Sequence, residues 1–309
     1  MERRILFKRI ITSICLALSV LTGMAQTPRA GEVEVFAGAE LNYADVNFVR
    51  LYNVLINMTP GVKWHLGHDW LVSGQAFIPV YNDGYQNKHN VIRLTNAALA
   101  KQLHFGNQHF KVTGGLFGYD RYGLDLRWMY PVTSWLMFNA QAGYTGEWRL
   151  ALNDATDWGK NHEIVTTKST VFGSLDRFSG IVGANVWLEP WHTELRLSCG
   201  RYIGEEYGVQ AEIMRHFPGC TVELYAQYHE RAKTKWAYRE GGGFKVIMLL
   251  PDKWKWKSRK VTLRPASNFR LTYNAQADVV SMKMYTTDPE ENERTYPVRI
   301  PWGTGNLKK

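Results

Sequence analysis

The chain has 309 residues, of which 45% are hydrophobic and 13% aromatic, with 12 tryptophans and a formal net charge of +9. After the first 25 residues no run of 18 apolar residues occurs, which excludes a transmembrane helix from that part of the sequence. The modest positive charge gives no indication of a nucleic-acid partner, although it suits an anionic polymer.

The N-terminus has the three parts of a secretory signal peptide. Four basic residues stand among the first nine, and residues 10–21 form an apolar run. Gly23 and Ala25 then place small residues at the positions that a signal peptidase reads. Because the apolar run is shorter than the roughly 20 residues that span a bilayer, we expect cleavage after Ala25 instead of an anchor helix. Residues 1–25 are therefore predicted to be a signal peptide and the chain to be exported.

From residue 32 onward the sequence reads as one strand after another. The clearest is residues 135–149, where apolar or aromatic side chains alternate with polar residues or glycine. Alternate side chains of a strand point to opposite faces, so this strand has one apolar and one polar face. The predicted strands are residues 32–43, 46–66, 70–80, 91–104, 109–118, 121–130, 135–149, 168–188, 192–203, 206–217, 220–231, 238–250 and 259–275.

The length of the strands and of their connections distinguishes a membrane barrel from a soluble β domain. Strands of about ten residues suit a tilted membrane crossing and exceed the usual five or six of soluble sheets. Short turns alternate with longer connections at residues 81–90, 151–167 and 232–237, and the exception is the basic Trp-Lys-Trp-Lys turn within 251–258. Outer-membrane barrels have short periplasmic turns and longer extracellular loops.

The sequence therefore predicts an all-β fold, an antiparallel transmembrane β-barrel of about 12–14 strands with a cleaved N-terminal signal peptide. The barrel is expected within residues 26–275, and residues 276–309 are expected to form a C-terminal strand or a periplasmic tail. Such a chain would reside in the outer membrane, in contact with lipid and lipopolysaccharide.

Two groups of residues are candidates for function. Charged residues that alternate with apolar neighbours should line the lumen, because the opposite register would put them into hydrocarbon. They are Arg121, Asp125, Arg127, Glu147, Arg149, Glu194, Arg196 and Glu212. Aromatic residues in the loops could stack on sugars or form the interfacial girdle. They are Tyr81, Tyr85, Trp158 and Trp236.

Signatures of catalysis are scarce. The chain has neither a Gly-x-Ser-x-Gly elbow nor a glycine-rich phosphate loop. His65 and His68 straddle a predicted turn, so we expect no metal site and no cofactor. Two carboxylates such as Glu194 and Glu212 could form a glycosidase pair, but arginines on the same faces favour a charge-neutralised network instead. We therefore expect a protein that is not an enzyme.

Three segments carry a family resemblance. Residues 200–217 (GRYIGEEYGVQAEIMRHF), 243–251 (GFKVIMLLP) and 264–274 (RPASNFRLTYN) resemble a hairpin, a strand ending in proline and the C-terminal block of YjbH-type outer-membrane proteins. The resemblance covers roughly residues 70–278. It implies a barrel that takes part in the biosynthesis or export of an exopolysaccharide or capsule, with the polysaccharide and other export proteins as partners. A general porin and, less readily, a barrel enzyme acting on lipid or glycan are the alternatives.

Overall fold

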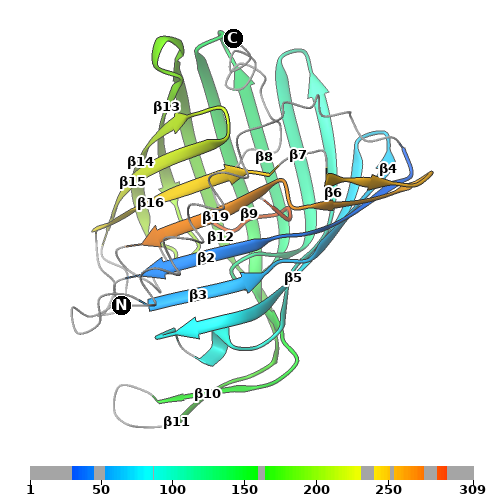
Figure 1. The fold of residues 1–309 in the computed structure, drawn as a ribbon. Coiled ribbons are helices and arrows are strands. Elements are labelled where there is room, and N and C mark those ends of the chain that lie inside the picture. The colour runs from blue at the N-terminus through cyan, green and yellow to red at the C-terminus, as the bar shows by residue number, and fades with distance from the viewer. Residues whose placement is uncertain are drawn as a thin grey trace, which may run out of the picture.

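The computed structural model describes residues 30–44, 53–85, 87–158, 164–230, 240–250, 254–274 and 284–290. These residues form a closed β-barrel of 13 strands (Figure 1). The prediction of an all-β barrel with about 12–14 strands is thereby confirmed. The predicted signal peptide, with its cleavage after Ala25, lies outside the described residues.

Neighbouring strands in the barrel follow one another in the sequence. Three barrel strands are bent and consist of two segments each: β1 (Glu32–Ala37) with β2 (Ala39–Ala44), β3 (Asn53–Met58) with β4 (Gly61–Gly67), and β18 (Val261–Pro265) with β19 (Asn268–Asn274). The other barrel strands are β5 (Trp70–Asp83), β6 (Arg93–Phe105), β7 (Gln108–Phe117), β8 (Arg121–Pro131), β9 (Leu136–Leu150), β12 (Thr170–Leu188), β13 (Thr193–Arg201), β14 (Tyr207–His216), β15 (Cys220–His229) and β16 (Glu240–Leu249).

The seam of the barrel corrects the prediction of a purely antiparallel sheet. The last bent strand pairs with the first in parallel, with Leu263 opposite Val35 and Leu271 opposite Leu41. In a barrel whose successive strands alternate in direction, an odd number of strands leaves the first and last pointing the same way. Only a parallel pairing can then close the wall, and the sheet is mixed.

The three bent strands break at one level of the wall. Across the breaks, the Thr59 N–H donates to the Gly38 carbonyl at 2.9 Å and the Ala266 N–H to the Ala37 carbonyl at 2.8 Å. Pro60 has no N–H to donate, and a Cβ on Gly38 would collide with the side chain of Ala266. The uninterrupted strands expected at 32–43, 46–66 and 259–275 are therefore wrong, although residues 45–52 and 275 lie outside the described part.

The remaining predicted strands agree with the structure to within three residues at each end. The main element that the sequence analysis missed is a two-stranded sheet inside the predicted loop 151–167, formed by β10 (Ala155–Trp158) and β11 (Ile164–Thr167). It contacts the short helix η1 (Asn87–His89), where the Asn87 N–H donates to Asp157 Oδ1 at 2.7 Å. A second short helix, η2 (Glu189–Trp191), and the two-residue strand β17 (Trp256–Lys257) lie in connections.

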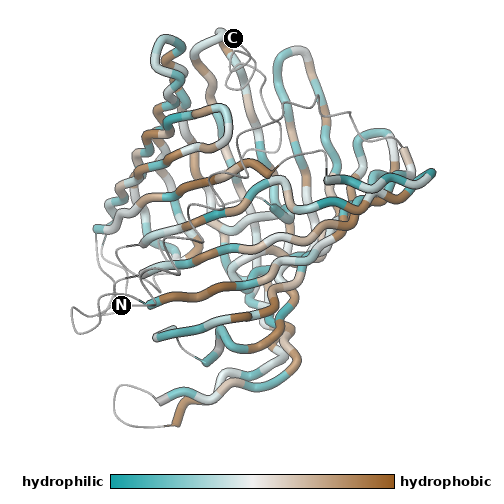
Figure 2. The backbone as a smooth tube through the Cα atoms, in the orientation of Figure 1, coloured by the Kyte–Doolittle hydropathy of each residue, from teal (hydrophilic) through white to brown (hydrophobic). Residues whose placement is uncertain are grey.

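The wall is apolar outside and polar inside. On β8, Leu124 is 63% exposed, whereas Asp125 and Arg127 on the same strand are only 2% and 4% exposed. On β14, Val209 is exposed and Glu212 is buried in the same way. Figure 2 shows the resulting succession of hydrophobic and hydrophilic residues along the strands. None of the helices among the described residues is long and apolar enough to cross a membrane.

Candidate functional site

The lumen is the candidate site, because the polar side chains of the strands converge there. On β8, Asp125 Oδ2 accepts a hydrogen bond from Gln141 Nε2 of β9 at 2.8 Å, and its Oδ1 lies 3.4 Å from Arg127 Nε. At the start of β8, Arg121 is buried and donates hydrogen bonds to the hydroxyl and the carbonyl of Thr145, each at 3.1 Å. The three predicted lining residues Arg121, Asp125 and Arg127 are therefore buried on one face of β8, beside polar groups of β9.

A second group crosses β12, β13 and β14. Arg196 Nε donates to Glu194 Oε1 at 2.8 Å, and Arg196 Nη1 lies 3.9 Å from Glu212 Oε2. Asn185 also donates to Glu194, at 2.6 Å, and accepts from Asn139 at 2.8 Å. Because Arg196 lies between the two carboxylates, both are engaged in an ion-pair network.

The last two predicted lining residues lie at the end of β9 that faces the long loops. Arg149 Nη2 pairs with Asp120 Oδ2 at 2.9 Å and lies 4.0 Å from Glu147. The Glu147 side chain is 53% exposed. The structure therefore separates Glu147 and Arg149 from the buried groups that contain the other six residues.

The loop aromatics do not form a single group in the part of the chain that the structure describes. Tyr81 is exposed on β5, and Tyr85 packs edge-on against His89 with ring centroids 5.6 Å apart. Trp158 ends β10, but its side chain lies outside the described residues. Trp236 lies outside them altogether, so a glycan-binding role for these four residues stays a prediction.

A segment that the sequence did not predict lies in the lumen. Residues 284–290 contact strands on opposite sides of the barrel and lie inside it (Figure 1). The Tyr285 ring is 0% exposed and stacks on Phe117 of β7, with centroids 5.3 Å apart and planes 11° apart. The Gly118 N–H donates to the Thr286 carbonyl at 2.9 Å, and Asn96 Nδ2 to the Thr287 carbonyl at 2.7 Å. We call residues 284–290 the internal segment.

Two carboxylates attach the internal segment to the wall. Asp288 pairs with Lys111 of β7, and both side chains are buried. Glu290 accepts hydrogen bonds from Arg264 Nη1 and Nη2, each at 2.8 Å, and from Lys63 Nζ at 2.9 Å. Burial raises the pKa of Glu290, but the hydrogen bond from Arg264 and the charge of Lys63 outweigh it and lower the pKa from 4.5 to about 2. Glu290 is therefore ionised at neutral pH.

The connection between β13 and β14 also enters the barrel. Tyr202 and Ile203 are buried together with Met284, Tyr285 and Phe117 in a small apolar cluster. The clean alternation of the flanking strands gave no sign that this turn folds inward. Residues 276–309 were expected to form a C-terminal strand or a periplasmic tail; the described part, 284–290, contains no strand. The rest of that segment lies outside the described residues, so the prediction for the whole stays a prediction.

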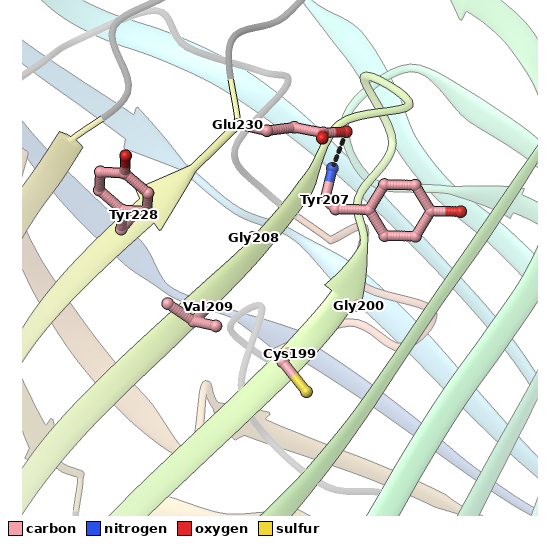
Figure 3. Close-up of a pocket in the computed structure, with 7 residues that line it drawn as sticks. All are labelled: Cys199, Gly200, Tyr207, Gly208, Val209, Tyr228 and Glu230. Carbon is pink, nitrogen blue, oxygen red and sulfur yellow. Dashed lines mark hydrogen bonds between the residues drawn. The ribbon is translucent and has the colours of Figure 1, made fainter.

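A shallow groove of about 580 Å³ lies on the outside of the wall, near the ends of β13, β14 and β15 (Figure 3). The rings of Tyr207 and Tyr228 lie on either side of Gly208, and the Tyr207 N–H donates to Glu230 at 3.0 Å. Val209 and Tyr228 are exposed here, like the other outward-facing side chains. The groove thus belongs to the apolar outer surface and does not open into the lumen network.

Over the described residues, no group of three or more His, Cys, Asp or Glu side chains is arranged to hold a metal ion. His65 contacts Glu34 at 3.2 Å, from the neighbouring strand β1. Comparisons with protein-family models, with curated proteins and with solved structures found no match to this chain.

Proposed function

We propose that this chain is an outer-membrane β-barrel that takes part in the biosynthesis or export of an exopolysaccharide or capsule, and that it is not an enzyme. The observation that carries the membrane location is the inverted wall, with Leu124 exposed beside a buried Asp125. Contiguous apolar surface on this scale would drive aggregation in water, whereas hydrocarbon is the solvent that it suits.

Export to the outer membrane is supported by the sequence of residues 1–25 and by the connections of the barrel. The turns after β4, β6, β12 and β14 are short and lie at one end, while the connection that contains β10 and β11 lies at the other. This is the asymmetry of outer-membrane barrels. Lipid and lipopolysaccharide are then the surroundings of the wall.

The contents of the lumen argue against a general porin. A diffusion channel needs a continuous water-filled path, but the internal segment and the Tyr202–Ile203 turn pack together inside the barrel beside Phe117. A barrel enzyme is also less well supported, because Glu194 and Glu212 are committed to Arg196. A long hydrated polymer suits a lumen lined with amides and paired charges, which offer hydrogen bonds without requiring a single tight pocket.

The resemblance of residues 200–217, 243–251 and 264–274 to YjbH-type proteins is what directs the proposal to exopolysaccharide or capsule. The test is a clean deletion strain, stained for surface polysaccharide and complemented with the wild-type gene. We expect less surface polysaccharide in the deletion strain and recovery on complementation. Normal exopolysaccharide and capsule under every growth condition tried would contradict the proposal.

A second complementing gene tests whether the loop aromatic residues contribute to the amount of surface polysaccharide. It carries Trp158→Ala and Trp236→Ala together, and its matched control carries Trp191→Ala, an exposed tryptophan on the short-turn side in η2. If the loop tryptophans stack on sugars, the double variant should restore less surface polysaccharide than the control at equal amounts of folded barrel. Equal restoration would assign these tryptophans to the interfacial girdle.

A further inference from the structure

The two carboxylates of the internal segment, Asp288 and Glu290, form ion pairs with cationic side chains of the barrel wall. Lys63, Lys111 and Arg264 come from β4, β7 and β18, and we call these three residues the cationic cradle. Lys63 and Arg264 are both held over the ring of Phe36, at 5.6 and 5.0 Å from its centroid. Their positions are therefore set by the wall and do not depend only on the segment that they bind.

Without the segment, the cradle would have an excess of positive charge. Glu34 is the wall carboxylate that pairs with Arg264, at 2.8 Å, and it also contacts His65. Asp125 interacts electrostatically with Lys111 and lies 3.4 Å from Arg127 Nε. Lys111 is almost fully buried and pairs with Asp288, and removing one partner of a buried ion pair is strongly destabilising. The cradle therefore requires an anion, and in this structure Asp288 and Glu290 provide it.

The uncharged contacts of the segment are those that a sugar chain would use. Tyr285 covers one face of the Phe117 ring, as a pyranose ring covers an aromatic face. The amides of Asn96 and Gln141 donate to carbonyls of the segment, at 2.7 and 3.5 Å, and could equally donate to hydroxyl or carboxylate oxygens. The lumen thus presents an aromatic platform, two amides and three cations along the path of the segment.

We propose that the internal segment is a built-in substitute for an acidic polysaccharide. When the segment withdraws, Phe117, Asn96, Gln141 and the cationic cradle bind a sugar chain that carries carboxylates, such as a polymer of uronic acids. The fork of Arg264, which now holds Glu290 through two hydrogen bonds, then holds a uronate in the same way. This inference rests on the proposed function, to which it adds the chemical class of the polymer.

The test measures binding of oligogalacturonate to the full-length protein in detergent, by calorimetry. The variant Asp288→Asn/Glu290→Gln removes the competing charges, and truncation after residue 283 removes the segment itself. We expect each to bind oligogalacturonate at least about tenfold more tightly than wild type, with affinity that falls as salt is added. Faster migration of unboiled protein on a denaturing gel confirms that each barrel is folded.

Three controls make the result specific. The fully methyl-esterified oligogalacturonate has the same rings without the charge and should not bind measurably. Asp154→Asn/Glu230→Gln removes two exposed carboxylates outside the lumen and should bind like wild type. Adding Lys111→Gln and Arg264→Gln to the truncated chain should abolish the gain. Equal affinity of the wild-type, amide and truncated chains, or equal binding of the methyl ester, would overturn the inference.

The outcomes also separate this inference from the proposed function. If the deletion strain loses surface polysaccharide but no variant gains affinity for oligogalacturonate, the acidic-polymer inference fails alone. If the variants gain affinity while the deletion strain keeps normal polysaccharide, the cradle binds acidic sugars but the proposed function is wrong.

Discussion

At the scale of single residues, the position of the internal segment depends on a few atoms. Gly143 of β9 leaves space for the hydroxyl of Tyr285, and Gly118 leaves space for Thr286; a Cβ at either position would collide with the segment. Glu290 is held by three hydrogen bonds from two cationic side chains. A single substitution can therefore remove one of these contacts without interrupting a strand of the wall.

Gly143→Val should displace the segment while the barrel stays closed. The larger side chain overpacks the Tyr285 site, at a cost of about 1–3 kcal/mol to the docked segment. We expect the chain after residue 274 to become more sensitive to protease, with unchanged migration of the unboiled barrel. The control is Gly74→Ala on β5, where a Cβ would meet Val62 at an ordinary 3.6 Å. Equal protease sensitivity of the two variants would show that Gly143 has no such role.

Acid should release the same segment. The pKa of Glu290 is lowered from 4.5 to about 2, so its ion pairs stabilise docking fully above pH 4.5 and lose that effect as the pH falls toward 2. The shift corresponds to about 3 kcal/mol at neutral pH. A fluorophore on the segment should report release within this window in wild type. Glu290→Gln should weaken docking already at neutral pH; an identical pH profile in both chains would contradict this account.

At the scale of elements, the sequence predicted the strands well where the two faces of the wall differ. β8, β14 and the first part of β9 were predicted because exposed and buried residues alternate along them. The parallel seam could not be predicted from alternation, since it depends on the exact number of strands. The four-residue strands β10 and β11 lie in a connection, and β11 is mostly exposed, so the sequence shows no alternation of apolar and polar residues there.

The candidate site was predicted only in part, for a related reason. Asp125, Arg196 and Glu212 stand in alternating strands, so their inward direction could be read from their neighbours. Met284 to Glu290 have no alternation, and their burial depends on partners as distant in the sequence as Lys63 and Asn96. The sequence gives one indication of a buried segment here, the aromatic and acidic side chains beside a proline. It can be interpreted only when the positions of the cationic side chains in the lumen are known.

The outward-facing side chain of Leu124 on β8 allows a test of whether the outer face of the wall contacts lipid or water. Leu124→Arg puts a charge on the outer face, which should destabilise the barrel in a bilayer by about 2–4 kcal/mol if the residue lies near the midplane. In an aqueous environment the same change at a 63% exposed position would be nearly neutral. Unfolding by urea in vesicles measures the difference. Leu152→Arg, in the loop after β9, is the matched control and should leave stability unchanged.

At the scale of the whole molecule, the structure is a closed wall around a lumen that the chain itself occupies. The wall has 13 strands, and the internal segment and the Tyr202–Ile203 turn meet inside it. A wall that is apolar outside and polar inside suits a bilayer. We therefore propose that this barrel inserts into a membrane with its lumen closed by residues 284–290.

Conductance across a planar lipid bilayer tests that claim most directly. Wild-type protein should insert and conduct little, because the internal segment lies inside the lumen. Protein truncated after residue 283 should insert equally well and give clearly larger current steps. Large, steady currents from the wild-type chain that truncation leaves unchanged would contradict the account and favour a general porin.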